Sequence, residues 1–174
     1  MRTAHPWCLP DQPTTRAELL SLGLTDHMIR TRVSSGDLVT VRHGVFVRAD
    51  RWPAEAAAQY VVRARAEQIA NPSALISHQS AAAAMGIPSP GFLRWEELPV
   101  SITLPPGHSS RSGPSVHHVG QTPASQITRD MHGYLMTSPA RTAVDLSADL
   151  ALPQALVLLD GACLLYTSPS PRDS

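Results

Sequence analysis

The sequence predicts an α+β fold, and three observations support this prediction. Residues 14–37 contain two short segments that begin with helix-capping residues. Residues 38–48 contain two β-branched runs separated by a turn. Residues 51–162 mix Ala-rich helical segments with further β-branched runs. We therefore expect a small N-terminal domain over residues 14–50 and a small mixed α/β domain after it.

Two short helices are expected at the start of the first domain. Thr15 and Glu18 have the spacing of a capping box, in which each side chain satisfies a backbone N–H group at the helix start. Thr25 is placed to cap a second helix over residues 26–35, and Gly36 follows that helix as a C-terminal glycine. The pattern predicts a helix, a tight turn and a second helix.

A β-hairpin is predicted after the two helices. Residues 38–41 and 45–48 are β-branched runs on either side of His43 and its following glycine. Both alternation phases of these runs contain apolar side chains, so the sequence does not assign the register. Two helices followed by a hairpin is the element order of a winged helix-turn-helix, which we predict for residues 14–50.

The second predicted helix has a polar side suited to DNA. Helical periodicity places Ile29 and Val33 on its packed side. Its opposite side and the hairpin tip carry donors that reach base edges and phosphates, and Arg32 is better placed for a phosphate than for a base. The candidate DNA-binding residues are His27, Arg30, Thr31, Arg32, Ser34, Arg42 and His43.

A plainer interpretation of the same pattern is a small helical domain with a solvated polar face. Between residues 14 and 51 the chain carries six arginines and four acidic residues, an excess of two positive charges. This excess is small beside the strongly basic character expected of a tight duplex binder. An interaction module without a nucleic-acid role therefore stays open as an alternative.

Composition excludes several kinds of chemistry. All 14 basic residues are arginine, and the formal net charge is zero. Without lysine the chain lacks a Gly-Lys phosphate loop, a Schiff-base lysine and a carboxylate-x-lysine nuclease centre. Cys8 and Cys163 lie far apart and predict no disulfide framework. No apolar run is long enough to span a bilayer, and residues 1–13 lack a signal-peptide core, so a cytoplasmic protein is expected.

An irregular segment is predicted before the first domain and a long helix after it. Residues 1–13 contain three prolines, which predict an irregular lead-in. Pro53 suits the first turn of a long helix that runs to about Ala70. Arg63 and Glu67, four residues apart, are expected to form an exposed pair on it. Its i, i+3, i+4, i+7 pattern predicts burial of Ala57, Tyr60, Val61 and Ala64.

The second domain is expected to continue with a helix, two strands and a short hairpin. Ser77 would cap the Ala-rich helix, which would end at Gly86. Residues 98–104 alternate as a half-buried strand, and residues 114–119 are its expected partner. The hairpin is predicted over residues 127–137.

Two helices are predicted near the end of the chain, followed by an unusual tail. Ser138 would cap the first helix, which would run to about Leu150, and Pro153 would open the second. Residues 163–174, CLLYTSPSPRDS, resemble the translation of a transposase-type sequencing adapter. We therefore expect a non-native tail and an α/β domain cut short near Ala162. The helix that Ser138 would cap is expected to turn Ala143, Val144 and Leu146 towards the core.

For several residues a structural role is better supported by the sequence than a catalytic or metal-binding role. Ser77 with His78 is expected to be a cap and a first-turn histidine, because no nucleophile elbow accompanies it. Arg141 and Asp145 are expected to form a surface pair, and the alternative is that Arg141, near a helix start, holds a nucleotide phosphate. Arg111 is a candidate second phosphate contact, with a solvated turn as the plainer interpretation. We predict no catalytic residue, cofactor or metal site, although four histidines invite comparison with one: His108, His117, His118 and His132.

Three motifs occur in order along the chain: LVTVRHGVFVR at residues 38–48, LISHQSAAAAMGI at 75–87 and MTSPARTAVDL at 136–146. Together they resemble the AbiEi-type antitoxin regulators of type IV toxin–antitoxin systems. The resemblance implies a transcriptional regulator whose winged helix represses its operon at operator repeats of double-stranded DNA. It also implies an antitoxin domain that acts without a stable toxin complex, and no enzymatic activity.

Two departures from that family matter. The usual helix ahead of Thr15 is replaced by the proline-containing lead-in. The chain also stops where some relatives continue into a region similar to the very-short-patch-repair endonucleases. The alternative function is therefore the recognition portion of a truncated endonuclease of that kind.

Overall fold

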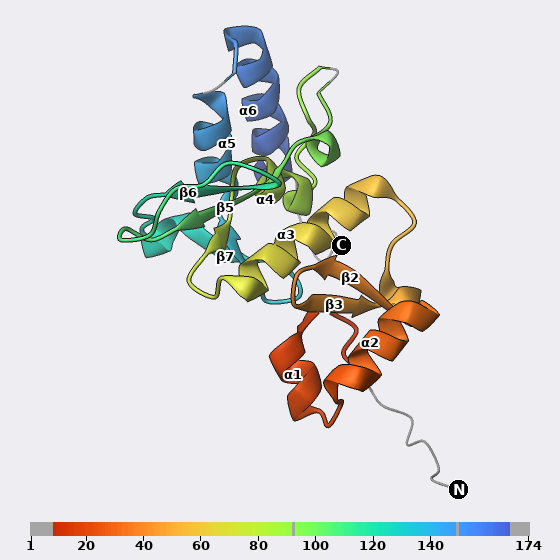
Figure 1. Ribbon diagram of the computed structural model, residues 1–174. Helices are drawn as coiled ribbons and strands as arrows, with labels where there is room; N and C mark the ends of the chain where they lie inside the picture. Colours follow the sequence, from red (N-terminus) through yellow and green to blue (C-terminus); the bar gives the residue numbers. More distant parts are fainter. Residues whose placement is uncertain (1–8, 92, 149, 168–174) are drawn as a thin grey trace, which may run out of the picture.

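The computed structural model describes residues 9–91, 93–148 and 150–167, and these residues confirm the α+β class with two β-sheets. In Figure 1 a small helix-and-sheet unit lies at one end of the molecule, the helix α3 (Ala56–Ala70) crosses its middle, and the second sheet and the last helices lie beyond it. The predicted lead-in falls partly on residues 1–8, which lie outside the described residues.

The N-terminal unit, residues 14–48, begins with the two predicted helices. Thr15 and Glu18 form both hydrogen bonds of a capping box at the start of α1 (Arg16–Ser21). Thr25 Oγ1 accepts a hydrogen bond from the Met28 N–H and caps α2 (Asp26–Ser35). Gly36 ends α2 with a φ of 83°, the left-handed conformation that favours glycine. Both helix predictions are confirmed.

A three-stranded antiparallel sheet completes this unit. Its strands are β1 (Thr14–Thr15), β2 (Leu38–Arg42) and β3 (Val45–Arg48), in the order β1-β3-β2. Phe46 packs with Leu38 and Ile29 on the side that α1 and α2 cover. Val45 and Val47 alternate with Phe46 and are buried on the other side, where α3 lies. Both sides of the hairpin are thus covered, which explains why both of its alternation phases are apolar.

The central helix α3 separates the two sheets. It contacts all three strands of the first sheet and also β4 and β5 of the second. Burial therefore extends around the helix: Tyr60 and Ala64 are buried as predicted, and Val62 is buried as well. Ala57 is exposed and Val61 is only half-buried, so those two predictions are wrong. A short 3-10 turn, η1 (Ala49–Arg51), precedes the helix, which begins after Pro53 rather than at it.

The second sheet has five strands in the order β6-β5-β4-β8-β7. Neighbours β5 and β6 are parallel, as are β4 and β8, and the other two pairs are antiparallel. The expected strand partners and the 127–137 hairpin are confirmed, whereas β4 was not predicted. The strands are β4 (Leu75–Ile76), β5 (Val100–Leu104), β6 (Ser115–Val119), β7 (Ile127–Arg129) and β8 (Leu135–Thr137).

Strand β5 is buried on both faces, which corrects the prediction of a half-buried strand. Its polar residues meet the start of α4 (His78–Met85): Thr103 Oγ1 donates to Ser77 Oγ at 2.8 Å, and Gln79 Nε2 donates to Ser101 Oγ at 2.8 Å. Ser77 occupies the N-cap position, but its hydroxyl forms no capping hydrogen bond, so that part of the prediction is wrong. Helix α4 ends at Gly86 as predicted.

The C-terminal helices α5 (Pro139–Ser147) and α6 (Leu152–Thr167) stand side by side in Figure 1. Ser138 caps α5 as predicted, with Ala143 and Leu146 buried. Val144 is 63% exposed, so its predicted inward position is wrong. Helix α6 continues beyond Ala162 to Thr167, and residues 168–174 lie outside the described residues. The non-native origin of the tail stays a prediction.

One apolar cluster holds the second sheet, α3, α4, α5 and α6 together. Trp95, in the 3-10 turn η2 (Trp95–Glu97), belongs to it and donates its indole N–H to the Ile87 carbonyl at 2.8 Å. A further 3-10 turn, η3 (Ala124–Gln126), precedes β7. None of the helices in the described part of the chain is both long and apolar enough to cross a membrane.

Substitution of Tyr60 tests the polar contact inside this cluster. Its hydroxyl lies 2.9 Å from Ser80 Oγ and donates to the Pro99 carbonyl at 3.0 Å. Tyr60→Phe should lower the free energy of unfolding by about 0.5–1.5 kcal/mol, because the Pro99 carbonyl loses one of two donors and keeps the hydrogen bond from Gln79 Nε2 at 2.8 Å. Urea denaturation measures this change, and exposed Ala57→Ser on the same helix is the matched control. Equal effects of the two substitutions would contradict the assignment.

The same side chain predicts a pH dependence. Burial raises the pKa of Tyr60 to about 12, whereas an unfolded tyrosine ionises near 10. The unfolded chain therefore releases this proton first, and stability should be lost as the pH rises from about 10 towards 12. The decline should be shallower in Tyr60→Phe than in the unsubstituted protein.

Candidate functional site

The outward face of α2 is open to solvent. His27, Arg30, Thr31 and Ser34 are all exposed, while Ile29 on the opposite face is buried against β2. Figure 1 shows α2 on the side of the first sheet away from α3. Four of the seven predicted contact residues therefore share one uncovered surface.

Arg32 and His43 lie outside this group of four exposed residues. Arg32, in the last turn of α2, is half-buried and lies at the margin of the outward face. His43 is exposed at the hairpin turn, next to Gly44, whose φ of 76° requires the left-handed conformation. The hairpin tip thus offers an imidazole to solvent.

An ion pair fixes α1 against α2. Arg16 binds Asp26 with two hydrogen bonds, Nε to Oδ1 at 2.7 Å and Nη2 to Oδ2 at 2.5 Å. These bonds lower the pKa of Asp26 below its usual value, and the charge of Arg30 acts in the same direction. The carboxylate stabilises the fold above the pKa of an unfolded aspartate, and this contribution is lost as the pH falls through the folded value.

Arg42 lies on the side of the hairpin that faces α3. The ladder between β2 and β3 shifts between Thr40 and Arg42, so Arg42 pairs with Val45 and takes the side of the sheet that α3 covers. Its guanidinium is 29% exposed, and Nη1 lies 3.0 Å from Glu67 Oε2 on α3. Arg42 thus lies near the hairpin turn but is bound to α3, and its contact with DNA stays a prediction.

The carboxylate of Glu67 is the centre of a buried polar cluster. Glu67 is only 7% exposed, which contradicts the predicted exposed pair with Arg63. His117 Nε2 on β6 lies 2.9 Å from Glu67 Oε1, and the Ser115 hydroxyl donates to the same oxygen at 3.3 Å. With Arg42, these contacts join the hairpin, α3 and β6 around one carboxylate.

Helical spacing contained the signal for this burial. Glu67 lies seven residues after Tyr60 and three after Ala64, so it shares the face on which both were predicted to be buried. A charged residue on that face needs a partner from another element. Arg63, four residues earlier, lies on the same side of α3 and lines the same pocket, but the Glu67 carboxylate binds Arg42 and His117 instead.

Arg63 and Arg111 lie at the rim of the same cluster. Arg63 is exposed, with its guanidinium carbon 5.9 Å from the ring centre of Trp52. Arg111 Nη2 donates to Ser115 Oγ at 3.1 Å, and its backbone forms a bridge with His117. Both arginines and Arg42 line a pocket of about 300 Å³ between the hairpin and the second sheet. We call it the junction pocket.

Ser77 and His78 have structural partners. Ser77 is fully buried, and its Oγ accepts from Thr103 and lies 3.0 Å from His78 Nδ1. His78 has a φ of 50°, and its ring stacks on His118 with 3.7 Å between the ring centres. Ser77 is thus held within the sheet rather than presented as a nucleophile.

The other candidates for chemistry were the histidines and the pair of Arg141 and Asp145. The described residues contain no group of three or more His, Cys, Asp or Glu side chains that could hold a metal ion. His117 binds Glu67, whereas the adjacent His118 stacks on His78, so the two rings point to different neighbours as expected. Arg141 and Asp145 form the predicted pair, at 2.8 and 2.9 Å.

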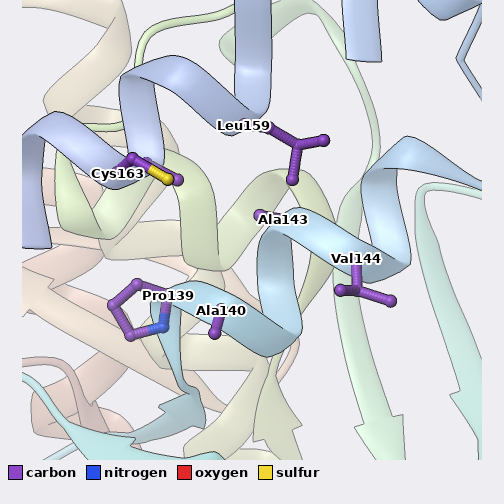
Figure 2. Close-up of a pocket in the computed structure, with 7 residues that line it drawn as sticks. Pro139, Ala140, Ala143, Val144, Leu159 and Cys163 are labelled. Carbon is purple, nitrogen blue, oxygen red and sulfur yellow. The ribbon is translucent and has the colours of Figure 1, made fainter. Parts of the chain in front are cut away.

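An apolar pocket of about 330 Å³ lies between α5 and α6. Figure 2 shows Pro139, Ala140, Ala143 and Val144 from α5 opposite Leu159 and Cys163 from α6. Hydrocarbon side chains dominate its lining, so it lacks the convergent polar groups that orient a substrate.

A double-mutant cycle tests the polar cluster. Glu67→Gln and Arg42→Gln should each destabilise the fold, because each leaves a partly buried charge without its counterion. Urea denaturation of both variants and of the double variant should give a coupling of about 1–3 kcal/mol. Arg16→Gln with Asp26→Asn, an exposed pair, is the matched control and should show a smaller coupling. Equal couplings would show that burial adds nothing to the Arg42–Glu67 pair.

Comparison with known proteins leaves the family of the chain unassigned. No model of a known protein family matches it, and no curated protein matches it. Its function is therefore inferred from its residues and their geometry.

Proposed function

We propose that the protein is a DNA-binding transcriptional repressor, with residues 14–50 as a winged helix-turn-helix and α2 as its recognition helix. The observation that carries this proposal is the uncovered polar face of α2, with His27, Arg30, Thr31 and Ser34 exposed together. A recognition helix needs such a face because side chains read base edges only when the helix enters the major groove.

The types of side chain on this face suit a duplex. An arginine in the middle of the helix can donate two hydrogen bonds to a guanine, and hydroxyls and imidazoles can bond bases or phosphates. We assign base contacts to Arg30 and Thr31, and phosphate contacts to Arg32 and to His43 at the hairpin tip. Arg42 supports DNA binding indirectly, because it holds the hairpin on α3 through Glu67.

The charges around α2 limit the affinity of a single copy. Arg16 is paired with Asp26, and Arg51 is paired with Asp11. Within the described part of the chain, Arg30 and Arg32 form no ion pair. Few phosphates are therefore neutralised per copy, and operator repeats would raise the overall affinity if the copies bound to them contact one another.

We further propose an antitoxin role of the AbiEi type, exerted without catalysis and without a stable toxin complex. The support is the ordered set of motifs at residues 38–48, 75–87 and 136–146. In the structure these residues supply the hairpin, the β4–α4 junction and the β8–α5 junction. The serines of the second motif are held inside the fold, which suits a binding protein better than a hydrolase.

Substitution of Arg30 tests the recognition helix. Arg30→Ala should weaken binding to DNA from the region upstream of its own gene by about 1–3 kcal/mol, because it removes a base contact. Fluorescence anisotropy with a labelled duplex measures this change. Arg94→Ala, an exposed arginine before η2 paired with Glu96, is the matched control and should leave the affinity unchanged. Unchanged binding by Arg30→Ala would overturn the assignment of α2.

Salt dependence tests the phosphate contacts separately. With about two phosphates neutralised per copy, the logarithm of the binding constant should fall with the logarithm of the salt concentration with a slope of about −2 per copy. Arg32→Ala should reduce that slope by about 1 and weaken binding to all sequences alike. If the slope is the same for Arg32→Ala and the unsubstituted protein, Arg32 does not contact a phosphate of the DNA.

A further inference from the structure

Three arginines from distant parts of the sequence meet in the junction pocket. Arg42 comes from β2, Arg63 from the middle of α3, and Arg111 from the segment before β6. The hairpin, the central helix and the second sheet thus each contribute one guanidinium to the same concavity. Its other lining residues are Val41, His43, Glu67, Val100, Pro114 and Ser115.

The charges of this pocket do not balance. Glu67 is the only carboxylate among the lining residues, so three arginines and one glutamate leave an excess of two positive charges. Glu67 is also shared with His117, at 2.9 Å. Like charges held close together in a concave site repel each other, and an anion bound between them would relieve that repulsion.

The donors of the three guanidiniums are incompletely used. Arg42 Nη1 is buried and forms the ion pair with Glu67 but no hydrogen bond of good geometry. Within the described part of the chain, Arg63 Nη2 donates to Gln59 Oε1 at 3.4 Å, and Arg111 Nη2 donates to the Ser115 hydroxyl at 3.1 Å. Each guanidinium carries five N–H donors, so most donors at the pocket stay available to a ligand.

We propose that the junction pocket binds a phosphate group. Arginine forks match the oxygens of a phosphate, and a volume of about 300 Å³ is at the lower end of ordinary ligand pockets. A phosphate bridging Arg42, Arg63 and Arg111 would fasten the hairpin to α3 and β6. The position of the hairpin, and with it His43, would then depend on whether the pocket is occupied.

The phosphate can come from either of two sources. One is a free phosphorylated small molecule, which would act as an effector of the protein. The other is the DNA backbone beside the hairpin, and only this source rests on the proposed DNA-binding function. The chemistry of recognition is the same for both, and separate measurements distinguish them.

Calorimetric titration with inorganic pyrophosphate, at constant ionic strength, tests the pocket directly. The unsubstituted protein should bind it and gain thermal stability in proportion to occupancy. Arg63→Gln and Arg111→Gln should each weaken binding about tenfold, because each removes a charged donor. Arg94→Gln is the matched control and should bind as tightly as the unsubstituted protein. Circular dichroism establishes that both pocket variants are folded, since these two arginines are exposed.

DNA titration of the same variants separates the sources. Loss of DNA affinity in Arg63→Gln and Arg111→Gln, with a smaller salt slope, identifies the backbone as a source of the phosphate. If these variants lose pyrophosphate binding, and DNA affinity is unchanged in them or absent in every protein tested, the source is a free phosphorylated ligand. This conclusion would hold even if the protein is no repressor. The proposal is overturned if both variants match Arg94→Gln in pyrophosphate binding and in DNA binding.

Discussion

The buried carboxylate of Glu67 is the contact on which the arrangement of the molecule depends. A carboxylate that is 7% exposed is costly to desolvate, and the cost is offset only while charged and hydrogen-bonding partners stay in place. Arg42 comes from the hairpin, and His117 and Ser115 come from β6. Sliding of the hairpin along α3 would separate these groups and leave a buried charge. Apolar packing alone would tolerate such a movement better, so the polar cluster makes the position of the hairpin specific.

The bulge in β2 is what brings Arg42 to that carboxylate. Without the extra residue between Thr40 and Arg42, strict alternation would place Arg42 on the side of α1 and α2. The hairpin therefore has two roles on its two sides. One side completes the core beneath α2, with Phe46 against Ile29, and the other carries the ion pair to α3. Since α2 and the Glu67 cluster lie on opposite sides of this sheet, the hairpin connects the two.

Local signals in the sequence predicted three of the four helix caps, and Ser77 is the exception because its hydroxyl bonds Thr103 on β5 instead of the helix backbone. Thr15, Thr25 and Ser138 cap helices as predicted, because a cap bonds to a backbone group three residues away. Long-range pairing was not predictable in the same way. Strand β4 has only two residues, too few to show alternation, and exists because β5 and β8 supply its hydrogen bonds. The same limit applies to the candidate site, where the exposed face of α2 followed from periodicity but the three-arginine pocket required the tertiary fold.

Three buried hydroxyls and three exposed guanidiniums bear on the proposed function. Three hydroxyls could act as nucleophiles, those of Tyr60, Ser77 and Ser80. All three side chains are buried, and their hydrogen bonds join α3, the start of α4 and β5. A nucleophile needs access to substrate and a base held ready to take its proton, and the hydrogen bonds of these groups serve the core instead. The guanidiniums of Arg30, Arg63 and Arg111 are exposed, and they lie on the face of α2 and around the junction pocket. The hydroxyls of Thr31 and Ser34 and the guanidiniums of Arg30, Arg63 and Arg111 are exposed donors, as the proposed binding to DNA and to a phosphate group requires.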